Sequence, residues 1–185
     1  MIPDITKDAE NRMTKAVEAA QHDFSTIRTG RANPALLEKI NVDYYGSQMS
    51  INQLAAITAP EPRLLMIAPW DKNAISAIEK SIMNSDLGLT PSSDGNVIRL
   101  QIPYLTEERR RDLIKLLHKK TEEHRVAVRN IRRDVNEKMK NMEKSHEIGE
   151  DDNKRGQEQV QKLTDKYIEQ IDKLQTAKEA ELMEV

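Results

Sequence analysis

The sequence predicts an α+β fold that is mainly α: an elongated three-helix bundle with a small inserted α/β domain, joined to it by a two-segment hinge. Two observations predict this fold. Six of the seven prolines and four of the six glycines lie between residues 30 and 103, and the flanking segments repeat apolar residues at helical spacing. Because proline stops helices and glycine weakens them, the middle third must differ in structure from its flanks.

The first helix is predicted between Pro3, which suits a helix start, and Gly30, which suits a helix stop. One apolar stripe runs along this segment, and its successive members are three or four positions apart, as on one face of a helix. The members of the stripe are Ala9, Met13, Val17, Ala20, Phe24 and Ile27.

The middle third has the shorter period of β-strands. Residues 40–44 alternate between apolar and polar side chains, residues 64–68 form a short apolar run, and residues 97–102 alternate in part. Between the second and the third of these segments, residues 74–83 have the spacing of a short helix. These segments predict a small α/β domain, whose strand order the sequence does not predict.

The predicted domain boundaries follow from this change of period. Residues 31–103 form the inserted α/β domain, and residues 1–30 and 104–185 form the bundle. The chain passes between the two domains twice, near residues 31–34 and near residues 103–105. Two short connections permit a hinge motion and restrict free tumbling.

The two remaining helices follow Pro103, after which no proline occurs. Thr106 suits the N-cap of the second helix, and the acidic run from Glu150 suits the start of the third. We expect Gly149 to close the turn between them. Three apolar stripes that face one another can all be buried, which favours a three-helix bundle. The stripe of the second helix is Leu113, Leu117, His124, Val128, Ile131, Val135 and Met139, and that of the third is Val160, Leu163, Tyr167, Ile171, Leu174 and Leu182.

Composition limits the functions to be considered. The chain has no cysteine, and none of its segments has the pattern of a signal peptide or a membrane span, so we expect a cytoplasmic monomer that binds no membrane. The four histidines lack metal-ligand spacing, and no glycine-rich phosphate loop occurs. We therefore predict no enzyme: no catalytic residue, no metal, no cofactor and no small-molecule substrate. His124 is expected to be a hydrogen-bonded histidine of the bundle.

The most distinctive feature is a stripe of four arginines in the second helix. Arg125, Arg129, Arg132 and Arg133 fall within about 100° of arc on a helical projection, roughly a quarter-turn from the apolar stripe. Residues 105–133 contain ten basic and five acidic residues, whereas the whole chain has a net charge of −2. The positive charge is therefore local.

An arginine beside a buried stripe packs its aliphatic stem on the bundle edge and presents its guanidinium to solvent. A guanidinium matches phosphate oxygens with two parallel hydrogen bonds, and the scarcity of aromatic residues argues against base stacking. The stripe therefore indicates binding to the backbone of structured RNA or DNA. Arg28 and Arg31, at the end of the first helix, are candidates to extend the same surface.

Two other interpretations stay open on the residues alone. The arginines could form a solvated face paired with acidic neighbours such as Glu122 and Asp134. The bundle could instead be a structural adaptor that docks another helical protein, which would need a row of exposed apolar residues.

Beyond these patterns, the chain resembles one known family along essentially its whole length. The segments that carry the resemblance are STIRTGRANPALL, VDYYGS, NQLAAITAPEPRLLMI, SDLGLTPSSDG, PYLTEERRRDL, RVAVRNIRRDVNEKMK and EDDNKRGQEQVQKLTDKYIEQID, followed by KEAELMEV. In order, spacing and total length these segments resemble the bacterial ribosome recycling factor family.

The resemblance implies more than the patterns do. Members of this family bind the ribosome after termination, with the bundle on large-subunit ribosomal RNA. With elongation factor G, and GTP hydrolysis by that factor, they separate the subunits so that messenger and transfer RNA leave. By this resemblance the RNA-facing positions are Arg28, Arg31, Arg129 and Arg132, and the stripe adds Arg125 and Arg133. The inserted domain would be where elongation factor G pushes.

Overall fold

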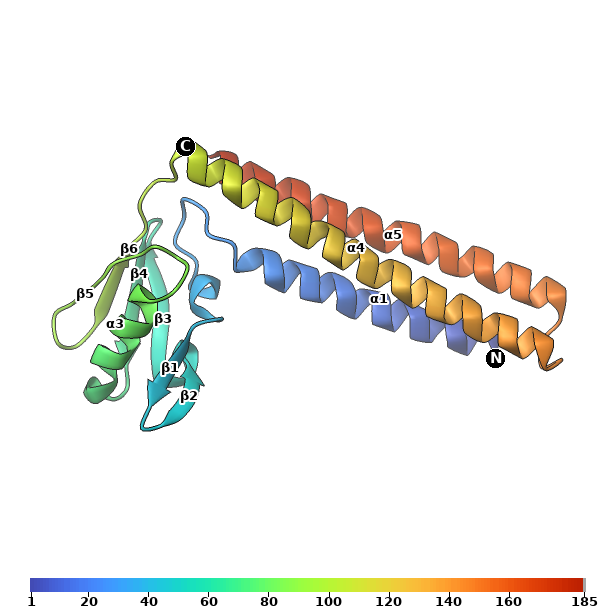
Figure 1. Ribbon diagram of the computed structural model, residues 1–185, viewed down its shortest axis with the longest axis horizontal. Helices are drawn as coiled ribbons and strands as arrows, with labels where there is room; N and C mark the ends of the chain where they lie inside the picture. The colour runs from blue at the N-terminus through green and yellow to red at the C-terminus, as the bar shows by residue number, and fades with distance from the viewer. Residues whose placement is uncertain (185) are drawn as a thin grey trace. The chain divides into compact units, whose positions relative to one another are not determined.

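The computed structural model describes residues 1–184, which form two compact units (Figure 1). The first unit consists of Met1–Phe24 and Lys115–Glu179, and the second consists of Ser25–Ile114 and the residues from Ala180 onward. The first is helical and the second contains the β-structure, which confirms the predicted fold class. The predicted domain ranges divide the chain at slightly different residues and stay a prediction.

The first unit consists of most of three long helices that lie side by side: α1 (Ile2–Ser25), α4 (Glu107–Lys144) and α5 (Glu150–Met183) (Figure 1). The predicted stripes are largely buried between them, with Met13, Leu117, Val128, Met139 and Ile171 at or close to zero exposure. In residues 1–184, no helix carries an apolar stretch of the length needed to cross a membrane.

Two threonines belong to this core although the stripes omit them. Thr121 and Thr164 are fully buried, and each hydroxyl donates to the carbonyl four residues earlier, at 2.7 Å to Leu117 O and 2.8 Å to Val160 O. Such back-bonding satisfies the hydroxyl inside its own helix, so a threonine can occupy an apolar seam.

The ends of α4 show one prediction confirmed and one corrected. Thr106 caps the helix, because its hydroxyl accepts the amide of Arg109 at 3.1 Å. At the other end, the left-handed residue is His146, with φ 61°, and not Gly149. The amides of His146 and Glu147 bond to the carbonyls of Glu143 and Met142 in a Schellman motif. Gly149 instead precedes α5 and accepts the amide of Asn153.

The second unit contains a four-stranded antiparallel sheet of order β3-β4-β6-β5 and a separate hairpin of β1 and β2. The strands are β1 (Asn41–Tyr44), β2 (Ser47–Ser50), β3 (Ala55–Glu61), β4 (Leu64–Pro69), β5 (Pro91–Ser93) and β6 (Ile98–Gln101). The short helix α2 (Ile51–Leu54) follows β2, and α3 (Ile75–Met83) follows β4, with 3-10 turns at Pro34–Leu37 and Lys72–Ala74.

The predicted strands correspond to β1, β4 and β6, and the predicted short helix to α3. The core of this unit lies between the sheet and α3, where Leu65, Ile67, Ile98 and Leu100 of the strands and Ile78 of the helix are fully buried. Strands β2, β3 and β5 were not predicted, because most of their side chains are exposed or only partly buried, and apolar alternation is therefore weak.

Candidate nucleic-acid interface

The four arginines of α4 form a surface that we call the arginine face: Arg125, Arg129, Arg132 and Arg133. Helix α4 places them beside the buried residues Val128, Ile131 and Val135, so each arginine side chain leaves the helix at the edge of the bundle core. Their exposure differs: about a quarter of the Arg125 side chain is exposed, Arg129 and Arg132 are half-buried, and Arg133 is exposed. The sequence prediction of one shared helical face agrees with this placement.

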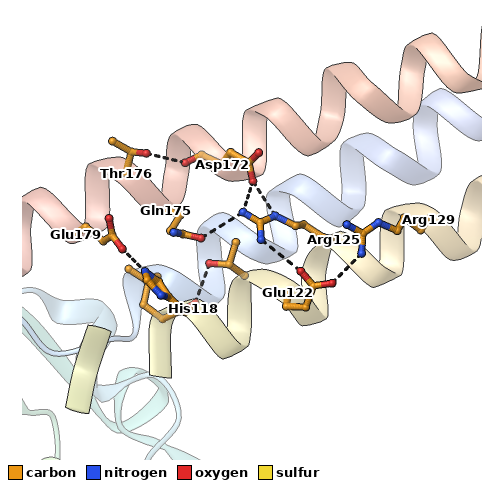
Figure 2. A network of polar contacts seen from close by, with 10 residues as sticks. His118, Glu122, Arg125, Arg129, Asp172, Gln175, Thr176 and Glu179 are labelled. Atoms are coloured by element: carbon orange, nitrogen blue, oxygen red, sulfur yellow. Dashed lines mark hydrogen bonds and ion pairs between the residues drawn. The ribbon is translucent and has the colours of Figure 1, made fainter. Parts of the chain in front are cut away.

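Arg125 is anchored to α5 (Figure 2). Its Nε donates to Asp172 Oδ1 at 2.7 Å, and Nη2 lies 2.6 Å from the same oxygen. Nη1 donates to Glu122 Oε2 at 3.3 Å, and Nη2 also donates to Gln175 Oε1 at 3.5 Å. Partial burial opposes its charge, yet the hydrogen bonds to Asp172 and Glu122 leave the pKa of Arg125 raised. All three nitrogens of this guanidinium are therefore occupied by the protein.

Glu122 joins Arg125 to Arg129 (Figure 2). Arg129 donates from Nη1 to Glu122 Oε1 at 2.7 Å, across two turns of α4. The hydrogen bond from Arg129, and then the one from Arg125, lowers the pKa of Glu122 below its ordinary value. Among residues 1–184, Nε and Nη2 of Arg129 have no recorded partner. These two groups form the side-on fork that binds a phosphate with two parallel bonds.

Arg132 and Arg133 complete the arginine face and, in residues 1–184, make fewer hydrogen bonds than Arg125. Arg132 donates from Nη1 to Gln161 Oε1 of α5 at 3.1 Å and is half-buried. Arg133 is exposed, and within the described part of the chain it makes no hydrogen bond or ion pair. The groups that remain available to a polyanion are therefore those of Arg129, Arg132 and Arg133.

Arg28 has a different environment, within the second unit. Only 8% of this residue is exposed, and its guanidinium donates to two backbone carbonyls, at 3.2 Å to Leu87 O and 3.2 Å to Pro103 O. Its Nε is buried and has no partner within residues 1–184. Burial lowers the pKa of Arg28, and the neighbouring guanidinium of Arg109 lowers it further. In this conformation Arg28 binds the protein's own backbone.

Arg31 is exposed and pairs with Glu184, with Nη2 3.0 Å from Oε2. It belongs to the second unit, like Arg28, whereas the arginine face belongs to the first. The predicted extension of the arginine face by Arg28 and Arg31 stays a prediction.

Comparison with known proteins agrees with the resemblance in the sequence. The sequence model of the family described as ribosome recycling factor matches residues 20–183. The chain belongs to the ribosome recycling factor family. The ribosome-recycling factors of Carboxydothermus hydrogenoformans and Syntrophomonas wolfei are each 60% identical to it over 185 residues, which is the full length of both chains in each comparison.

Solved structures of ribosome recycling factors have the same fold. A solution structure of a ribosome recycling factor is 52% identical, covers 100% of this chain and 98% of its own, and superposes with a TM-score of 0.74. The T. thermophilus ribosome recycling factor, in a structure with E. coli elongation factor G bound to the E. coli post-termination complex, is 44% identical, with full coverage of both chains and a TM-score of 0.68.

The partners of the arginine face were only partly predicted. The sequence suggested Glu122 and Asp134 as acidic neighbours; Glu122 fills that role, but Asp134 pairs with Arg12 of α1 at 3.0 Å. Asp172 and Gln161 were missed. Both lie on α5, and no signal within α4 indicates which residues of another helix face it.

The histidine expectation is met. His124 Nε2 lies 2.9 Å from Asp23 Oδ2, and its ring contacts Phe24 edge to face at 5.7 Å between centroids. Lys120 donates to the other oxygen of Asp23 at 2.7 Å. Within the described residues, no cluster of three or more His, Cys, Asp or Glu side chains could hold a metal.

Proposed function

We propose that this chain binds the post-termination ribosome through large-subunit ribosomal RNA and, together with elongation factor G, separates the subunits. GTP hydrolysis by elongation factor G would drive the separation, and messenger and transfer RNA would leave. The chain itself acts as a binding and remodelling factor and catalyses no reaction. The second unit is the part on which elongation factor G would act, through the two connections that we expect to behave as a hinge.

The observation that carries this proposal is the arginine face on a member of the ribosome recycling factor family. Arg129, Arg132 and Arg133 retain donors that residues 1–184 do not use, while Arg125 is fixed to α5. Ordered guanidinium groups on a stiff helix can bind the phosphates of folded RNA with little further loss of side-chain freedom. The T. thermophilus relative on the post-termination complex supports the ribosome as the target.

The adaptor interpretation has less support. It would need a row of exposed apolar residues on the bundle. On α4 the large apolar residues with substantial exposure are Leu116 and Val126, at 41% and 42%, and they lie almost three turns apart. On α4, two separated residues do not form a docking stripe.

The binding step is tested with Arg132→Glu. We expect this variant to lose affinity for purified large ribosomal subunits by at least tenfold, because a phosphate contact becomes a repulsion. Arg132 is half-buried and, within the described part of the chain, bonds to Gln161 alone, so the helix content measured by circular dichroism should not change. For the unmodified protein, four to six phosphate contacts predict a log–log salt slope of roughly −3 to −5. Wild-type affinity in a folded variant, or salt-independent binding, would contradict the proposal.

The separation step is tested with intact ribosomes in the post-termination state. Light scattering should fall when this chain, elongation factor G and GTP are all present, and it should not fall when any one of them is omitted. Dissociation that proceeds without elongation factor G would contradict the second half of the proposal.

A further inference from the structure

We propose that Glu122 is a positioning residue: although its own charge repels a phosphate, it orients Arg129 of the arginine face for phosphate binding. This inference rests on the proposed function. Glu122 would thus promote RNA binding, although its negative charge alone would weaken it.

A series of hydrogen bonds and ion pairs connects α5 with Arg129 (Figure 2). Asp172 holds the side-on edge of Arg125, through Nε at 2.7 Å and Nη2 at 2.6 Å. Arg125 in turn holds Glu122 Oε2, and Glu122 Oε1 holds Nη1 of Arg129. Negative and positive groups alternate from the neighbouring helix to an arginine on the open surface, so each fixes the next.

The side chains in this connection differ in burial: Arg125 is the more buried, and Glu122 and Arg129 are the more exposed. About a quarter of the Arg125 side chain is exposed, against 40% of Arg129 and 51% of Glu122. The inner end is held by the bundle, and the outer end presents its guanidinium to solvent. Without Glu122, the Arg129 side chain would have no recorded partner in the described residues and would sample many rotamers.

The hydrogen bond from Arg129 to Glu122 leaves the Nε and Nη2 groups of Arg129 available for a phosphate. Glu122 uses Nη1 only, and Nε with Nη2 form the parallel fork that suits two phosphate oxygens. Glu122 therefore occupies Nη1, the nitrogen of Arg129 that takes no part in a side-on phosphate contact. A preordered fork binds more tightly than a mobile one, because less conformational entropy is lost on binding.

This proposal and simple electrostatics predict opposite signs for one substitution. Glu122→Gln removes a negative charge from an RNA-facing surface, so charge alone predicts equal or tighter binding to a polyanion. Positioning predicts weaker binding, by about 2- to 10-fold, since a neutral amide offers one oxygen acceptor in place of two charged oxygens.

Glu123→Gln is the matched control. Glu123 is the next residue of α4, is exposed, carries the same charge and has no recorded hydrogen bond or ion pair in residues 1–184. We expect its affinity to equal or slightly exceed that of the unmodified protein. Glu122→Asp is the second test variant, because it keeps the charge but shortens the side chain so that it cannot reach both arginines. We expect it to weaken binding about as much as Glu122→Gln.

The measurement is binding to purified large ribosomal subunits over a range of salt concentrations, with Arg129→Ala and Arg132→Ala in parallel. The two arginine variants should lose affinity and lower the salt slope by about 0.7–0.9 each, because each removes a phosphate contact. The Glu122 variants should lose affinity at an unchanged slope, because the contacts remain and only their preorganisation is lost. Circular dichroism confirms that each variant is folded.

The outcomes separate this inference from the proposed function. If Glu122→Gln binds as tightly as Glu123→Gln, or if Glu122→Asp binds like the unmodified protein, the positioning role is wrong while the arginine face stands. If Arg129→Ala and Arg132→Ala both bind like the unmodified protein, the arginine face is not the RNA site, and both proposals fail.

Discussion

Arg125 and Arg28 have the same side chain in two very different settings. Arg125, at the edge of the bundle, is held by carboxylates and an amide, and about a quarter of its side chain is exposed. Arg28, in the second unit, is almost fully buried and is held by two backbone carbonyls. The sequence proposed one role for both, and the structure gives them different partners.

These partners distinguish an arginine that organises a surface from one that stabilises a fold. A guanidinium paired with exposed carboxylates can exchange those partners for water or phosphate at little cost. A buried guanidinium bound to carbonyls cannot leave without exposing or orphaning them. Arg28 contacts two loops that are distant in sequence, at Leu87 and Pro103, so its removal should loosen both.

The largest expected effect is on the stability of the second unit. Arg28→Ala should lower its free energy of unfolding by about 2–3 kcal/mol, because two carbonyls lose their donor and a void remains. Native-state hydrogen exchange of the β6 amides measures this unit by itself. Arg31→Ala is the control, since the exposed pair with Glu184 should contribute no more than about 1 kcal/mol. If the two variants lost equal stability, the structural role of Arg28 would be refuted.

A smaller effect is expected in the bundle. Arg125→Met keeps the aliphatic stem but breaks the bonds to Asp172 and Glu122, which should cost about 0.5–1 kcal/mol, because both carboxylates can be rehydrated. Exchange of α4 and α5 amides near the substitution is the appropriate measurement. Arg133→Met, which breaks no recorded contact of the described chain, should change stability by less than about 0.5 kcal/mol. A loss above 2 kcal/mol for Arg125→Met would remove the contrast with Arg28.

The smallest expected effect is a loss of folding stability at low pH. In the second unit, Asp94 accepts the amides of Val97 and Asn96 and pairs with Arg99, which lowers its pKa to about 2. Since this folded-state pKa lies below the ordinary value of 3.8, the stabilisation is complete above about pH 4 and is lost as pH falls toward 2. In the bundle, the lowered pKa of Glu122 acts in the same direction, starting below 4.5.

Carboxyl carbon shifts followed by NMR measure both groups. Asp94 should titrate near pH 2, and Asp94→Asn should remove part of the acid sensitivity of the second unit while leaving the bundle unchanged. For Glu122, the midpoint should rise when Arg129→Ala removes its principal donor. A midpoint for Asp94 near its ordinary value would show that the turn does not hold the carboxylate.

The sequence predicted those parts of the fold whose signal lies within one element. Helical spacing identified α1, α4 and α5, and Thr106 marked the start of α4. The strands β2, β3 and β5 lack such a signal, because most of their side chains are exposed or only partly buried. They form by pairing with β1, β4 and β6, respectively. Likewise, His146 has the left-handed conformation at the end of α4, where glycine is the usual residue, so the sequence did not indicate it.

By itself the sequence determined which arginines share a face, since 3.6 residues per turn fix the direction of each side chain on a helix. It also determined the family. Only the tertiary structure decided what each guanidinium touches: Asp172 for Arg125, Gln161 for Arg132 and two loop carbonyls for Arg28. Those partners come from other segments, and the register in which segments pack depends on the whole core and not on any local pattern.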